Sequence, residues 1–312
     1  MKCKICQSEN NEVIRDTLRY GVKRDVLKCH NCGFVFLGKA NEKEYYQSEQ
    51  YRKNYGPNLN KVSNSKEIFD TYFPFQYQMI QEVEFILKPN TKILDVGCST
   101  GHFLAALKDK VKIRVGLELD KSAVEFINKN LDFKVYDQPI QDVEIAEGPF
   151  DVITSFQVLE HIENPLEFLQ AIDKNLKPGG YLYLEVPNLN DILLSIYKIK
   201  GFEDFYYREP HLSYFNEQSF KKLLDETGFK GEIGSVQRYN FLNHLNWIFT
   251  GKPQGEFSQG NLPPVLVKSD DVDKKVKDDL NSFIQSVDSQ YKALINKHKL
   301  GENLTFLGQK NN

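Results

Sequence analysis

The sequence predicts an α/β fold built on a doubly wound, mostly parallel β-sheet. Three observations support this prediction. Short apolar runs alternate with helical patterns from residue 93 to residue 236, which is the order of elements in a parallel sheet. The first run leads into a glycine turn at residues 97 to 101, and a carboxylate, Glu118, follows the end of the next run. This pairing indicates an adenosine-type ligand, because a carboxylate at a neighbouring strand end can accept both ribose hydroxyl protons.

The individual elements follow from apolar runs and capping residues. We expect strands at 93–96, 113–117, 133–136 and 150–156, and a helix over 70–87 ahead of the first strand. Further helices should begin after the glycine turn and after two capping sites. Asp120 is one expected N-cap, and Asn164-Pro165 forms a cap and first-turn pair.

The second half of the chain continues the pattern. Lys177-Pro-Gly-Gly180 should end the preceding helix, and Asn216 should cap a helix that stops at Gly228 before a strand over 229–236. A long helix then carries an apolar stripe that we expect to pack on the domain. The stripe consists of Val272, Val276, Leu280, Phe283, Val287, Tyr291 and Leu294.

Composition excludes some classes of function. The 312 residues include 40 Lys and Arg against 43 Asp and Glu, so a net charge of -3 provides no global basic field for nucleic acid. No apolar run is long enough to cross a bilayer, and the chain begins with Met-Lys-Cys-Lys, which is unlike a signal peptide. We therefore expect a cytoplasmic protein without a membrane partner.

Four cysteines have the spacing of a zinc ribbon. Cys3-x-x-Cys6 and Cys29-x-x-Cys32 stand 22 residues apart, and a hairpin between them would bring four thiolates to one tetrahedral Zn²⁺ ion. Two disulfides are the alternative, which a cytoplasmic location disfavours. Four protein ligands leave no open position, so the ion should be structural. We expect a ribbon over 1–40, a connector and possible lid over 41–70, and the main domain over 71–312.

The glycine turn resembles that of the class I S-adenosylmethionine-dependent methyltransferases. Asp95, Gly97 and Gly101 form their Asp-x-Gly-x-x-x-Gly pattern, and residues 151–161 and 176–187 resemble their fourth and fifth strands. A dinucleotide fingerprint would require glycine at positions 99 and 102. The resemblance implies a Rossmann-like, seven-stranded sheet with an antiparallel last strand. Residues 303–307 are the candidate for that strand, and 239–302 would be a helical insertion.

The same resemblance implies which residues bind S-adenosylmethionine. Glu118 would hold the ribose, Asp137 and Ile140 would lie near the adenine, and Gln157 near the methionine moiety. The expected cofactor-binding residues are Asp95, Gly97, Cys98, Gly101, Glu118, Leu119, Asp137, Ile140 and Gln157.

Methyl transfer requires an acceptor held in line, and a hydroxyl, ammonium or acidic carbon acceptor also requires a base. His161 and His211 are the candidate bases because both follow strand ends at the ligand-binding edge. Residues 209–215 resemble the histidine motif of zinc-ribbon-bearing sugar C-methyltransferases, which places Tyr214 with the catalytic candidates. Glu160-His161 resembles the ion-holding motif of quinone-precursor O-methyltransferases, although Gln157 replaces its first carboxylate.

The leading hypothesis is a methyltransferase acting on a small polar acceptor, with a nucleotide-linked sugar or surface-glycan precursor as the first candidate. An RNA base methyltransferase that binds RNA through its ribbon is the second, and a non-catalytic cofactor- or partner-binding module is the third. The overall acidic charge argues against RNA. The ribbon nevertheless has a local basic excess, which consists of Lys2, Lys4, Arg15, Arg19, Lys23, Arg24 and Lys28.

Overall fold

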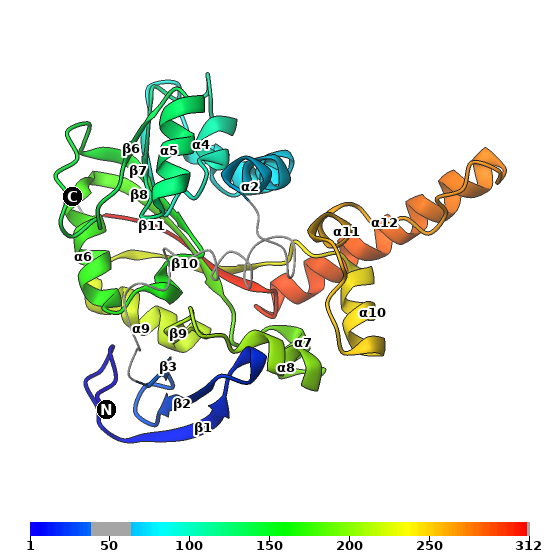
Figure 1. Ribbon diagram of the computed structural model, residues 1–312, viewed down its shortest axis with the longest axis horizontal. Coiled ribbons are helices and arrows are strands. Elements are labelled where there is room, and N and C mark those ends of the chain that lie inside the picture. The colour runs from blue at the N-terminus through cyan, green and yellow to red at the C-terminus, as the bar shows by residue number, and fades with distance from the viewer. Residues whose placement is uncertain (39–63, 311–312) are drawn as a thin grey trace.

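A seven-stranded β-sheet forms the centre of the protein (Figure 1). The structure is a computed structural model that describes residues 1–38 and 64–310. The strands are β1 (Asn11–Thr17), β2 (Lys23–Cys29), β3 (Val35–Leu37), β4 (Lys92–Val96), β5 (Ile113–Leu117), β6 (Lys134–Tyr136), β7 (Phe150–Phe156), β8 (Leu176–Pro187), β9 (Ser213–Tyr214), β10 (Lys230–Val236) and β11 (Asn303–Gln309).

Helices cover both faces of this sheet. The α-helices are α2 (Ser65–Tyr72), α3 (Gln76–Val83), α4 (His102–Ala106), α5 (Lys121–Asn130), α6 (Pro165–Asn175), α7 (Ile192–Ser195), α8 (Lys200–Tyr206), α9 (Glu217–Thr227), α10 (Phe241–Thr250), α11 (Phe257–Asn261) and α12 (Lys274–Lys297). Short 3₁₀ segments are η1 (Arg19–Gly21), η3 (Phe73–Phe75), η4 (Glu84–Ile86) and η5 (Leu159–His161). No helix in the described ranges combines the length and apolarity that a membrane crossing requires.

The strand order confirms the predicted fold class. The sheet runs β10-β11-β8-β7-β4-β5-β6, with parallel pairing from β8 to β6 and with β11 antiparallel to both β8 and β10. Successive strand residues face opposite layers. Leu94 packs with α6 and α9, whereas Ile93 packs with α3, α4 and α5. The order reverses direction between β4 and β7, and parallel sheets bind their ligands at such a position.

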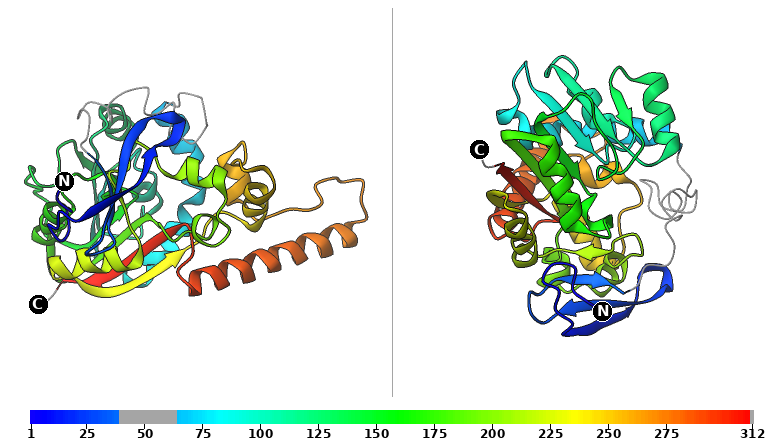
Figure 2. Two further views of the ribbon diagram at one scale, coloured as in Figure 1. Left: turned by 90° about the horizontal axis from the view of Figure 1, so that it is seen from below. Right: turned by 90° about the vertical axis from the view of Figure 1, so that its left-hand side faces the viewer.

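A second, smaller sheet joins the N-terminal ribbon to the main domain. Its order is β1-β2-β3-β9, so a strand from residues 213–214 completes the ribbon (Figure 2). The core is shared as well, because the Phe34 and Phe215 rings have centroids 5.4 Å apart. Arg15 also pairs with Asp204 on α8, with 2.5 Å between Nη2 and Oδ1. The ribbon is therefore built into the rest of the fold.

Capping residues define the helix boundaries as the sequence predicts. Asp120 caps α5, Asn164 caps α6 with Pro165 in its first turn, and Asn216 caps α9. In each helix the capping side chain accepts a hydrogen bond from a backbone N–H group of the first turn, which has no partner inside the helix. Gly228 ends α9 in the left-handed region, with φ at 79°.

Two expected boundaries were wrong. The helix predicted over 70–87 is divided into α2 and α3 by η3, because Pro74 lacks the N–H group that a continuous helix needs. α6 already ends at Asn175, and Lys177-Pro-Gly-Gly180 belongs to the start of β8. The expected connector spans residues 41–70. Residues 41–63 of it lie outside the described residues, and residues 65–70 belong to α2.

The packing of the long apolar stripe was also predicted wrongly. α12 projects away from the body of the protein (Figures 1 and 2), and Phe283 on the stripe is 62% exposed. The helix instead buries Ile284, Asp288 and Ile295. At about 100° per residue these three lie roughly a quarter turn from the predicted stripe. The stripe is exposed because α12 extends beyond the edge of the domain that would cover it.

Candidate active site and metal centre

A cavity of about 840 Å³ opens at the carboxyl ends of β4, β5, β7 and β8. Its wall has two ends. The glycine-loop end is lined by Gly97, Ser99, Glu118, Leu119, Ile140 and Gln157. The histidine end is lined by Arg19, His161, Asp191, Tyr206, Arg208 and His211. The cavity therefore has predicted cofactor-binding residues at one end and the two predicted histidines at the other.

The backbone turn after β4 requires glycine. Gly97 has φ at 79°, and a Cβ atom there would lie 2.3 Å from Cγ2 of Val158. The turn is held against the neighbouring strand, because the N–H groups of Gly97 and Cys98 both donate to the carbonyl oxygen of Leu117. Glycine is therefore what lets this turn pack against Val158 while Gly97 itself lines the cavity.

Glu118 is fixed by the backbone around the turn. Its carboxylate accepts hydrogen bonds from the N–H groups of Ser99 at 2.8 Å, Leu119 at 2.7 Å and Asp120 at 2.8 Å. Burial raises the pKa of this carboxyl group, and the three N–H donors oppose that rise. A carboxylate has about four lone-pair positions, so Glu118 retains capacity for a ligand hydroxyl.

The remaining residues predicted for this end divide into two groups. Leu119, Ile140 and Gln157 line the cavity, and Gln157, with φ at 57°, donates its backbone N–H to Glu185 of β8. Asp137 is exposed beyond the end of β6 and does not form part of the wall. Gly101 begins α4, with φ at 77°, and also lies behind the wall.

Asp95 and Cys98 lie beneath the glycine turn. Asp95 is 3% exposed and accepts a hydrogen bond from Oγ1 of Thr154 at 2.7 Å. Burial, with a contribution from Glu118, raises the pKa of Asp95 to about 7. The Cys98 thiol packs against Gly116, where a Cβ atom would lie 2.6 Å from Sγ. Both side chains therefore support the turn from below, outside the cavity wall.

The two predicted histidines lie together at the other end. The His161 and His211 rings have centroids 4.8 Å apart and are nearly perpendicular, at 86°. Nδ1 of His161 lies 2.9 Å from the carbonyl oxygen of Pro210. Burial and the nearby Arg208 lower the pKa of His161 to about 3, and the same two causes hold the pKa of His211 well below its usual value. Both imidazoles are consequently neutral at physiological pH.

The proton positions follow from the hydrogen bonds. Because a carbonyl oxygen only accepts, Nδ1 of His161 must carry the proton and Nε2 must carry the lone pair. For His211 the arrangement is reversed. Nε of Arg208 donates to Nε2 of His211 at 2.8 Å, so the lone pair is used there and the proton resides on Nδ1. That Nδ1 atom is buried and has no hydrogen-bond acceptor among the described residues.

Glu160 is a buried carboxyl group between the histidines. Its Oε1 atom lies 3.7 Å from Nε2 of His161 and 3.9 Å from Nε2 of His211, and neither carboxyl oxygen has a hydrogen-bond partner in the described part of the chain. Burial raises its pKa to about 8. The three side chains are close enough to share a metal ion. However, Arg208 occupies the His211 lone pair, so of these three side chains His211 is not a ligand in this arrangement.

Tyr214, the third predicted catalytic residue, supports the histidine end from outside the cavity. Its side chain is 1% exposed and does not line the wall. The hydroxyl donates to the carbonyl oxygen of Arg208 and accepts from the Arg208 N–H group, both at 3.0 Å. Both hydrogen bonds fix the backbone of the loop that carries Arg208 and His211.

Several wall residues were absent from the sequence prediction. Glu185 at the end of β8 and Arg238 after β10 form a buried ion pair with two parallel hydrogen bonds, of 2.5 and 2.7 Å. Arg19 reaches the wall from the ribbon, 7% exposed. Glu185 could have been predicted as a wall residue, because it is a carboxylate near the end of a predicted strand. The positions of both arginines depend on tertiary packing and leave no local pattern.

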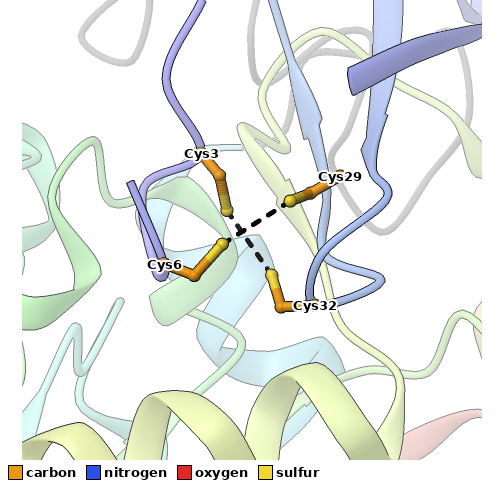
Figure 3. A group of neighbouring side chains, drawn as sticks. All are labelled: Cys3, Cys6, Cys29 and Cys32. Atoms are coloured by element: carbon orange, nitrogen blue, oxygen red, sulfur yellow. Dashed lines mark hydrogen bonds between the residues drawn. The ribbon is translucent and has the colours of Figure 1, made fainter. Parts of the chain in front are cut away.

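The four predicted metal ligands lie together (Figure 3). Sγ of Cys3 is 3.6 Å from Sγ of Cys32, and the same distance separates Cys6 from Cys29. All four are free cysteines with ligand atoms within 4.8 Å of one another. Sulfurs around a tetrahedral Zn²⁺ ion with Zn–S bonds of about 2.3 Å are separated by about 3.8 Å. The thiol set therefore fits zinc in spacing and in chemistry.

Comparison with known proteins gives a family and a fold. Residues 72–232 match the family model described as methyltransferase domain. The chain is 27% identical over 160 residues to a ubiquinone biosynthesis O-methyltransferase of Aliivibrio fischeri, covering 48% of this chain and 68% of that one. A protein of the same name from Vibrio parahaemolyticus is 28% identical over 165 residues, with 49% and 69% covered.

A solved structure has a similar fold. It is an S-adenosylmethionine-dependent methyltransferase from Archaeoglobus fulgidus, with a TM-score of 0.51 and 17% sequence identity. The alignment covers 78% of this chain and 97% of that one.

Proposed function

This chain belongs to the methyltransferase domain family and is an S-adenosylmethionine-dependent methyltransferase, and from that premise we propose that it methylates a small polar acceptor bound at the histidine end. One observation carries the proposal. A single cavity connects the glycine turn and Glu118 with a buried cluster of ionisable side chains, Glu160, His161 and His211. Such a cluster at one side of a ligand cavity is typical of proton transfer.

The glycine-loop end suits the donor. When bound there, S-adenosylmethionine would supply an electrophilic methyl group on a positively charged sulfur. Gly97 lets the backbone approach the ligand, and Glu118 offers its remaining acceptor capacity to the ribose hydroxyls. Leu119, Ile140 and Gln157 complete the wall around it. Asp95, Cys98 and Gly101 are proposed to hold the turn in shape.

His161 is proposed to accept the acceptor proton. In the neutral tautomer fixed by the Pro210 carbonyl oxygen, Nε2 carries the lone pair of the ring. The proton would move from the acceptor to Nε2 of His161, and Oε1 of Glu160 lies 3.7 Å from that atom. His211 is proposed to donate a hydrogen bond from Nδ1, because Arg208 holds its other nitrogen. Tyr214 is proposed as a positioning residue for this loop.

Two classes of acceptor fit the proposed site. A nucleotide-linked sugar or surface-glycan precursor is the first candidate, since the polar atoms at the histidine end match a polyhydroxylated ligand. A hydroxylated ring is the second, because the relatives named above are ubiquinone biosynthesis O-methyltransferases. Both would present a hydroxyl or an acidic carbon to His161.

The ribbon over residues 1–40 is proposed to bind a structural zinc ion through Cys3, Cys6, Cys29 and Cys32. Its role would be to hold β3, which pairs with β9 two residues after His211. This arrangement links the ribbon to the acceptor loop of the main domain over 71–312. It supports a role in shaping the acceptor site over a role in RNA binding.

The proposal can be tested with labelled S-adenosylmethionine and three acceptor classes: nucleotide sugars, hydroxylated aromatic acids and RNA. We expect label transfer to one of the small-molecule classes. His161→Asn should lower kcat roughly 100-fold or more, the usual contribution of a positioned base, and should leave the dissociation constant of S-adenosylhomocysteine unchanged. His298→Asn, at the exposed residue that follows the last turn of α12, is the matched control. Transfer to RNA alone, or full turnover by His161→Asn, would refute the proposal.

A further inference from the structure

α12 forms an arm that extends from the body of the protein (Figures 1 and 2). One side of the helix is already covered. Asp288 accepts a hydrogen bond from the Phe241 N–H group at the start of α10, at 2.6 Å, and Ile295 is buried. Further along the arm, Oδ1 of Asn281 accepts hydrogen bonds from the N–H groups of residues 266 and 267, at 2.9 and 3.0 Å. The helix is therefore held on this side without a contribution from its apolar stripe.

About a quarter turn away, the helix carries the apolar stripe from Val272 to Leu294. Most of its side chains are exposed, and Phe283 is the most exposed of them at 62%. Beside the stripe, on the side away from Ile284, the middle of the helix presents exposed residues without charge. They are Ser282, Ser286, Gln290 and Ala293. A second helix can therefore pack closely along this face.

The spacing of the stripe is nearly the same in both directions from Phe283. Its other members stand 3, 7 and 11 positions before Phe283 and 4, 8 and 11 positions after it. When two copies of one helix pack antiparallel about a twofold axis, residues at equal distances on the two sides of the axis meet. An axis at Phe283 would therefore match apolar residues along the whole stripe. The facing pairs are Leu280 with Val287, Val276 with Tyr291, and Val272 with Leu294.

The charges at the two ends of the arm are complementary in the same arrangement. Asp270, Asp271 and Asp273 precede the first turn of α12, and Lys297 is exposed in its last turn. Asp270 stands 13 positions before Phe283 and Lys297 stands 14 positions after it, so an antiparallel partner brings opposite charges together at both ends. Antiparallel packing also places the positive end of each helix dipole beside the negative end of the other. A parallel pair would place the acidic ends together.

We propose that α12 is a dimerisation arm, and that two copies of this chain pack antiparallel along their stripes about a twofold axis at Phe283. A different protein or a lipid surface would require an apolar face. It would not require one whose spacing and end charges both repeat about its own midpoint. The matched stripe is roughly 33 Å long at about 1.5 Å per residue. Two such stripes form an interface at the small end of the specific range, so we expect a dissociation constant of roughly 1 to 100 μM.

The test is sedimentation velocity of the full-length, zinc-loaded protein at concentrations below and above that dissociation constant. We expect a reversible shift from the 36.2 kDa monomer to a species of twice that mass. Phe283→Arg should weaken association roughly 100-fold or more, because it removes the central ring and places two like charges at the axis. Phe85→Arg in η4 is the matched control, since it replaces a similarly exposed ring on another part of the protein. It should leave association unchanged.

Disulfide formation tests the orientation of the two helices. A mixture of Leu280→Cys and Val287→Cys proteins should form a disulfide-linked heterodimer under mild oxidation, whereas either variant alone should not, because only residues from opposite sides of the axis meet. Far-ultraviolet circular dichroism and thermal unfolding show whether Phe283→Arg is folded. The proposal is overturned if the wild type remains monomeric, if folded Phe283→Arg associates as the wild type does, or if Phe85→Arg dissociates the dimer. Cross-linking of Leu280→Cys alone as readily as the mixture would also overturn it, because that result indicates parallel helices.

Discussion

Replacing Glu160 by glutamine should make the protein less sensitive to alkaline pH. Burial raises the pKa of this carboxyl group from an ordinary value of 4.5 to about 8. The folded state therefore holds a proton that the unfolded chain releases above pH 4.5. Stability from this group is complete below pH 4.5 and is lost as the pH rises towards 8. Each pKa unit corresponds to about 1.4 kcal/mol, so the whole loss is about 5 kcal/mol.

Roughly half of that loss falls above pH 6, because the titration from pH 6 to pH 8 spans two pKa units. The free energy of unfolding, measured by urea denaturation at pH 6, 7, 8 and 9, should decline for the wild type by about 2.5 to 3 kcal/mol more than for Glu160→Gln. Glu125→Gln, which removes an exposed carboxyl group on α5, should follow the wild type at every pH. A stability difference between wild type and Glu160→Gln that stays constant from pH 6 to pH 9 would refute the reasoning.

Three further predictions concern the turn, the buried ion pair and the ribbon. Gly97→Ala should abolish binding of S-adenosylhomocysteine in calorimetry, because the new methyl group would overlap Val158 and displace the turn; unchanged affinity would contradict the requirement for glycine at this position. Arg238→Met should lower the free energy of unfolding by about 3 to 5 kcal/mol by leaving Glu185 buried without its partner. The double variant with Glu185→Met should recover much of this loss in the same urea titration, and a purely additive loss would argue against pairing. Removing the metal with a chelator should increase hydrogen exchange in β9 but not in β5, because only β9 pairs with the ribbon; equal protection before and after chelation would exclude the proposed coupling.

Local chemistry determined which parts of the fold the sequence could predict. Asp120, Asn164 and Asn216 each cap a helix because a short polar side chain reaches the first free N–H groups, an interaction within three residues. The exposure of α12 could not be predicted in this way. An apolar stripe indicates that one face of a helix favours burial. Whether a neighbouring element covers that face depends on where the helix lies relative to the domain. Phe283 remained exposed for that reason.

The candidate site shows the same division. The motif around Gly97 and Glu118 is contained in one strand, turn and strand, so the sequence located that end of the cavity. At the other end, the sequence predicted His161 and His211 from two separate segments. It did not predict how the two rings are oriented. Arg208 determines which nitrogen of His211 carries the proton, and Arg19 arrives from a segment nearly two hundred residues earlier. Such contacts arise only when distant segments pack together.

The pairing of β3 with β9 bears on how this enzyme can be shortened. Judged from the domain boundaries alone, a deletion of the first forty residues should not disturb the main domain. It removes a peripheral segment and retains every strand of the large sheet. It would nevertheless uncover the Phe215 ring and strip β9 of its neighbour. Trimming the amino terminus should therefore yield a protein that keeps the proposed cofactor end of the cavity and loses one side of the proposed acceptor end.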